Sequence, residues 1–82
     1  MYSVDTRGPA GEQITALAPE GLGPFAELRV MLETSPWSGE PYMAERSDGP
    51  MRTCTFGIGG LATYLILEDQ RRVDILLVQW VE

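Results

Sequence analysis

The sequence predicts a single α+β domain, in which an N-terminal helical hairpin packs on a C-terminal antiparallel sheet. An amphipathic helical pattern fills residues 25–33, and β-rich apolar runs fill residues 61–68 and 72–81. A chain of 82 residues is near the lower size limit for a domain that folds alone, so one core is expected across residues 1–82. Residues 1–10 are expected either to form a short strand or to be disordered.

Two short helices are predicted in the first half of the chain, at residues 11–18 and 25–33. In the second, Phe25, Leu28 and either Met31 or Leu32 recur at the spacing of one helical face. Pro19 is expected to end the first helix, and Pro24 suits the first position of the second. We therefore expect a helical hairpin with a loose, glycine-containing link.

Three strands of an antiparallel meander are predicted at residues 51–56, 61–68 and 72–81. The middle strand is apolar on both faces, since Leu61 and Leu65 alternate with Ala62 and Tyr64. A strand of this kind is usually covered on both sides. One face is expected to lie under the helices, and the other is a candidate surface for a partner.

A long loop is predicted at residues 35–50, which are rich in proline and glycine. Loops of this length are uncommon in small domains and are often functional. This loop carries Trp37, Tyr42, Glu45 and Arg46, so the candidate site is expected there.

The composition excludes several kinds of site. With no histidine, a histidine base, a histidine metal ligand and a Ser-His pair are all excluded within this chain. The single cysteine, Cys54, forms no internal disulfide and fits a reducing compartment as a buried strand residue. No metal-ligand spacing, long apolar run or secretory signal is present, so we expect no metal, no cofactor, no membrane span and a cytoplasmic location.

The net charge of −6 bears on the choice of partner. An acidic surface repels nucleic acid at long range and attracts a basic protein segment. The six basic residues are all arginines, which bind phosphate through two parallel hydrogen bonds.

In the order and spacing of three segments, the chain resembles the RelE/ParE toxin superfamily of type II toxin–antitoxin systems. The three segments are LETSPWSGEP, DGPMRTCTFG and LATYLILEDQRRVDILLVQW, and the resemblance covers residues 25–81. It implies two helices before a meander, and a cognate antitoxin that wraps the toxin as an extended segment. It also implies either ribosome-dependent mRNA cleavage or the poisoning of DNA gyrase.

The resemblance implies site residues for RNA cleavage as well. Arg52 lies where the family has a phosphate-contacting arginine, and Arg46 is within reach of the same patch. Glu45, or less well Glu40, matches a loop carboxylate that acts as the base in some members. Tyr42 and Tyr64 are candidates for stacking on a nucleobase.

Two departures make this catalytic set incomplete. Residues 61–63 carry no arginine where the family has its second sheet arginine, and the last strand ends Gln-Trp-Val-Glu without a catalytic side chain. The sequence therefore predicts a RelE/ParE-like toxin that is an mRNA endonuclease with missing groups.

Other interpretations remain open for single residues. Trp37 and Trp80 are either core residues or, if exposed, partner-binding hot spots. Arg52 is alternatively an exposed strand residue that pairs with Glu68 or Asp74.

Two other functions remain open for the whole chain. The first is a non-catalytic protein-binding or homodimeric module on the same scaffold. The second is a structural module unrelated to the toxins, and a parallel strand in the sheet is expected to favour it.

Overall fold

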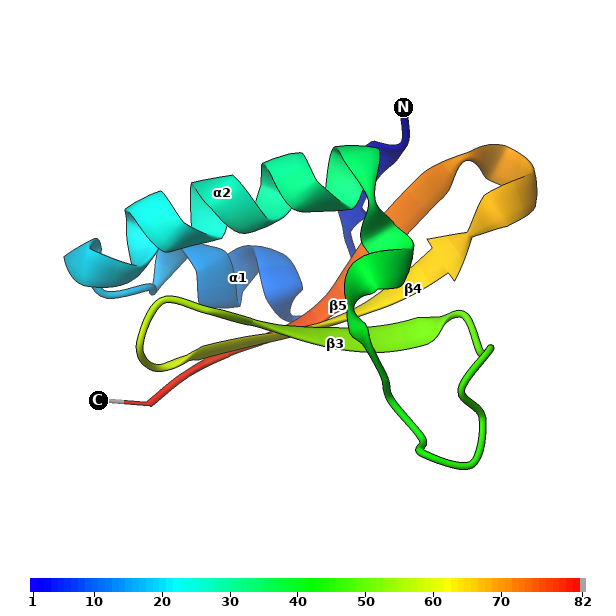
Figure 1. The fold of residues 1–82 in the computed structure, drawn as a ribbon. Coiled ribbons are helices and arrows are strands. Elements are labelled where there is room, and N and C mark those ends of the chain that lie inside the picture. The colour runs from blue at the N-terminus through cyan, green and yellow to red at the C-terminus, as the bar shows by residue number, and fades with distance from the viewer. Residues whose placement is uncertain (82) are drawn as a thin grey trace.

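Two helices lie on one face of a five-stranded sheet in the computed structural model, which describes residues 1–81 (Figure 1). The sheet order is β1-β5-β4-β3-β2. The elements are β1 (Ser3–Thr6), α1 (Ala10–Thr15), α2 (Pro19–Thr34), β2 (Glu40–Pro41), β3 (Met51–Phe56), β4 (Gly60–Leu67) and β5 (Arg72–Trp80), with 3₁₀ turns at Pro36–Ser38 and Glu68–Gln70. The predicted α+β class is confirmed.

The sheet is mixed, so the prediction of a purely antiparallel sheet was wrong. Strands β3, β4 and β5 pair antiparallel in the predicted order, but β1 pairs parallel with β5, with Val4 opposite Val73. The two helices carry the chain from β1 back across the sheet, so that β1 and β5 run the same way. Of the two alternatives predicted for residues 1–10, a strand is confirmed, at Ser3–Thr6.

Helix α2 begins at Pro19, which corrects the predicted start near Pro24. Proline suits the first helical position because its missing N–H needs no partner there. Pro24 lies inside the helix and gives up one internal hydrogen bond. Gly21 lies against the Trp80 ring, which leaves no comfortable room for a Cβ atom, and this glycine therefore serves close packing rather than a loose link.

The core lies between α2 and the sheet. The predicted face of α2 is confirmed, because Phe25, Leu28 and Leu32 are all buried. The Phe25 and Phe56 rings meet edge to face, with their centroids 5.3 Å apart. This contact joins the helix to the end of β3.

The register of the sheet gives its two faces different neighbours. Ala62, Tyr64 and Ile66 of β4 are buried in the core beneath the helices, whereas Leu61 and Leu65 point the other way and are half-buried. No described helix covers that second face (Figure 1). We call it the open face; the strand register places on it the apolar residues Met51, Leu61, Leu65, Leu67 and Leu77 together with Thr53, Thr55, Thr63, Arg72, Asp74 and Gln79.

The chain between β2 and β3 extends beyond the sheet on the side away from the helices (Figure 1). Within residues 1–81, no helix is long and apolar enough to cross a membrane.

Candidate functional site

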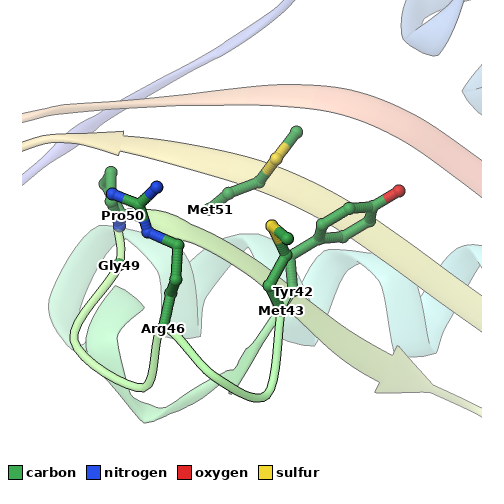
Figure 2. Close-up of a pocket in the computed structure, with 6 residues that line it drawn as sticks. All are labelled: Tyr42, Met43, Arg46, Gly49, Pro50 and Met51. Carbon is green, nitrogen blue, oxygen red and sulfur yellow. The ribbon is translucent and has the colours of Figure 1, made fainter.

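The loop before β3 forms two consecutive turns that are tied back to the strand. The Arg46 amide donates to the Met43 carbonyl, and the Gly49 amide to the Arg46 carbonyl, both at 2.9 Å. The Tyr42 amide donates to the Met51 carbonyl, also at 2.9 Å. An open pocket of about 260 Å³ lies against the loop, lined by Tyr42, Met43, Arg46, Gly49, Pro50 and Met51 (Figure 2).

Arg52 lies inside this loop and not on the surface. Its Nε donates to the Gly49 carbonyl at 3.0 Å and its Nη2 to the Ser47 carbonyl at 2.8 Å. Its Nη1 donates to the carbonyls of Gly39 at 3.1 Å and Trp37 at 3.4 Å. Only 8% of the residue is exposed. The alternative pairing with Glu68 or Asp74 was therefore wrong, and contact between Arg52 and a phosphate stays a prediction.

Tyr64 is completely buried, which corrects its assignment as a base-stacking residue. Its hydroxyl donates to the Pro36 carbonyl at 2.7 Å, at the junction between the helices and the sheet. Burial raises the pKa of the phenol to about 12. The hydroxyl also fills the space where a side chain at position 39 would lie, so Gly39 is required for this approach.

Three of the predicted site residues do lie on the exposed loop. Tyr42 is 55% exposed, and it lines the pocket together with Arg46. Glu45 is exposed on the same loop but does not line the pocket, and Glu40 is exposed on the edge strand β2. The loop therefore brings Tyr42 and Arg46 together and leaves both carboxylates outside.

Arg46 differs from the other arginines in its contacts. Within residues 1–81, five of the six arginines donate to an acceptor of the chain, and Arg46 is the exception. Its guanidinium is therefore free for an external ligand.

Trp37 ties the start of the loop to the β4–β5 turn. Its indole N–H donates to Glu68 at 2.8 Å, and the same carboxylate accepts bonds from the Tyr2 hydroxyl at 2.6 Å and from Arg71 at 3.0 Å. The Tyr2 hydrogen bond, followed by that of Trp37, lowers the pKa of Glu68. The ring remains 39% exposed, so contact between Trp37 and a partner stays a prediction.

The Trp80 side chain packs mainly against other residues of the chain. It is half-buried, with its ring centroid 5.9 Å from that of Phe56, and it lies against Gly21 and Gly57. A partner-binding role for Trp80 stays a prediction and is limited to the part of the ring that faces solvent.

Sequence reasoning missed a charged cluster beside the open face. Asp74 is 5% exposed and forms ion pairs with Arg72 at 3.1 Å and with Arg7 at 3.3 Å. The signal was a single aspartate inside an otherwise apolar strand, which implies partners because an unpaired buried carboxylate is costly. The cluster joins the end of β1 to β5.

Solved structures resemble this chain along its whole length. The isolated RelE toxin of E. coli has a TM-score of 0.79 at 14% identity, over 100% of this chain and 86% of that one. A chain of the RelBE2 toxin–antitoxin complex of Mycobacterium tuberculosis has a TM-score of 0.80 at 23% identity, over 98% and 91%. A chain of the intact E. coli RelBE complex has a TM-score of 0.76 at 16% identity, over 100% and 99%. No protein-family model and no curated protein matches the sequence.

The matches cover the parallel strand β1 as well as the meander. The expectation that a parallel strand argues against the toxin resemblance was therefore wrong. Because the likeness spans all the described elements at low identity, the chain has the fold of the RelE toxin superfamily.

Proposed function

We propose that this protein is a RelE-like toxin of a toxin–antitoxin pair and that an antitoxin protein holds it inactive. The observation that carries the proposal is the match to RelE structures over 100% of this chain. The RelBE structures that resemble this chain are toxin–antitoxin complexes.

The open face and the pocket loop are the surfaces we assign to partners. Apolar side chains on the open face are half-buried without any described helix above them. Exposed apolar surface of this kind marks interaction sites. The net charge of −6 favours a basic protein segment as the antitoxin contact.

RNA cleavage is not part of the proposed mode of action. Cleavage requires cations against the negative charge that develops on the reacting phosphate. Arg52 already serves the loop carbonyls, and Tyr64 is buried. Within residues 1–81, this leaves Arg46 as the arginine without an internal acceptor. We therefore propose that the protein acts by binding its target, as a non-catalytic module on the toxin scaffold.

The test is regulated expression in a bacterial host, with growth and the integrity of translated mRNA followed together. Growth arrest with intact message is the expected result. Ile58→Ala is the matched control, because Ile58 is 99% exposed at a hairpin tip remote from the loop, and it should arrest growth as the natural protein does.

Two other results would change the proposal. Arrest with cleaved message, lost in Arg46→Gln, would establish an endonuclease that uses the exposed loop. Normal growth at confirmed soluble expression would remove the toxin assignment and leave a binding or homodimeric module on the RelE fold.

A further inference from the structure

The pocket under the loop has the size of one side chain rather than of a small-molecule ligand. Its volume is about 260 Å³. Pockets for small molecules typically span roughly 300–1,000 Å³. A single Leu, Phe or Trp side chain is therefore the natural occupant, in the manner of an interface anchor.

The walls of the pocket suit an apolar, flat group. Tyr42, Met43, Pro50 and Met51 supply apolar surface, and Figure 2 shows them along the loop and the adjoining strand. Methionine adapts to the shape of its neighbour and makes favourable sulfur–aromatic contacts. With two methionines in the wall, the pocket favours an aromatic occupant.

The pocket is held open by Arg52. The carbonyls of Gly39, Ser47 and Gly49 all accept hydrogen bonds from the one buried guanidinium. Lysine has no planar fork and is unable to reproduce this set of bonds. The loop is therefore fixed before a ligand arrives, which lowers the entropic cost of binding.

The charges on the loop indicate what flanks the occupant. Glu40, Glu45 and Asp48 are exposed on and beside the loop, against the single exposed Arg46. The chain as a whole carries −6. Cationic residues on either side of the anchor complement this surface, and acidic residues are repelled.

We propose that the pocket receives one large apolar side chain, preferentially aromatic, from a basic segment of a protein partner. We further propose that Arg52 is the positioning residue that keeps the pocket formed. The identity of the occupant as a protein side chain rests on the proposed function, whereas the pocket and the role of Arg52 rest on geometry alone.

The experiment uses the full chain labelled at its methionine methyl groups. The four methionines divide into two that line the pocket, Met43 and Met51, and two that do not, Met1 and Met31. The probe is the peptide acetyl-Arg-Phe-Arg-amide, compared with acetyl-Arg-Ala-Arg-amide and acetyl-Glu-Phe-Glu-amide. We expect saturable NMR shifts of Met43 and Met51 with the first peptide only, with a dissociation constant on the order of 1 mM.

Variants distinguish binding in the pocket from nonspecific binding of the peptide to exposed apolar surface. Tyr42→Ala, at an exposed wall residue, should weaken the peptide about tenfold, while Ile58→Ala removes an exposed apolar side chain elsewhere and should change nothing. Arg52→Lys should abolish the shifts.

Trypsin provides a second measurement on Arg52→Lys. Because the natural chain contains no lysine, the tryptic sites are its six arginines, and Arg46 lies in the loop. Loop release should accelerate cleavage after Arg46 without changing the rate after Arg29 in α2. Equal cleavage rates after Arg46 in the variant and in the natural protein would overturn the positioning role.

The remaining outcomes each decide one part of the proposal. Shifts of equal size at Met31, or no saturable shift of Met43 and Met51, would overturn the pocket. Tighter binding of the glutamate-flanked peptide than of the arginine-flanked peptide would overturn the proposal that the partner segment is basic. None of these results depends on growth arrest, so the pocket and the toxin assignment fail separately.

Discussion

Strand β4 presents apolar side chains on both faces of the sheet, yet the two faces have opposite roles. On β4, Tyr64 and Ile66 are at most 2% exposed under the helices, while Leu61 and Leu65 on the open face remain half-buried. Side-chain type does not separate the two sets, because leucine and isoleucine are equally apolar. What separates them is the position of the two helices. The comparison teaches that the second face stays apolar without contributing to the core.

The largest effect should distinguish the two faces within a single strand. Ile66→Ala removes a side chain from the packed core and should lower the free energy of unfolding by about 2–5 kcal/mol. Leu65→Ala, at the neighbouring position on the open face, should lower it by only about 1 kcal/mol. Denaturant unfolding of both variants measures the difference. Equal losses would mean that the open face is covered in solution, for example by a second copy of the chain.

The same contrast applies to the two loop arginines. Arg52→Met leaves four carbonyls of residues 37–49 without their donor and should destabilise the protein by about 3 kcal/mol. Arg46→Gln, at an exposed position, should stay within about 0.5 kcal/mol of the natural protein. Thermal unfolding of the pair is the measurement, and a stable Arg52→Met variant would contradict the internal role of Arg52.

Tyr64 offers a pH test of the covered face. Its folded-state pKa of about 12 lies above the ordinary phenol value, so the folded state holds the proton more tightly. This contribution is complete below the unfolded-state pKa of about 10 and is lost as the pH rises towards about 12. Tyr64→Phe should remove this part of the alkaline loss of stability. Ionisation of Tyr64 near the ordinary phenol pKa of about 10, followed by phenolate absorbance, would contradict its burial.

The smallest effect is expected at the surface cluster around Glu68. Its carboxylate accepts bonds from Tyr2, Trp37 and Arg71, which lower its pKa. The contribution is therefore present above the ordinary carboxyl pKa and is lost as the pH falls through the lowered value. Glu68→Gln should be less stable than the natural protein at neutral pH, with the difference shrinking in acid. A difference that persists in acid would assign the loss to shape rather than to charge.

Local pattern explains how much of the fold could be predicted. The periodicity of Phe25, Leu28 and Leu32 identified the buried face of α2, and the alternation along β4 identified two apolar faces. The parallel pairing of β1 was missed because strand order depends on where the helices cross the sheet. The start of α2 was misassigned to Pro24 because Pro19 was taken to end the preceding helix, whereas it occupies the first position of α2.

The site was harder to predict because burial decides what a polar side chain does. Arg52 and Arg46 are the same residue type six positions apart, but one serves loop carbonyls and the other faces solvent. Tyr42 and Tyr64 differ in the same way. No local signal distinguishes the members of either pair, and the ion pair between Asp74 and Arg72 was missed although an aspartate within the apolar run of β5 pointed to it.

The most direct test of the account is growth arrest and unfolding measured together for Leu65→Gln, with Ile58→Ala as its control. Leu65 is half-buried on the open face, and Ile58 is exposed in the β3–β4 turn, seven residues earlier in the chain. The account predicts that Leu65→Gln stays folded, with its free energy of unfolding within about 1.5 kcal/mol of the natural protein, and no longer arrests growth. The control should remain folded and active. Full growth arrest by a folded Leu65→Gln variant would show that the open face is not needed for arrest and would contradict its assignment as the surface that contacts the target.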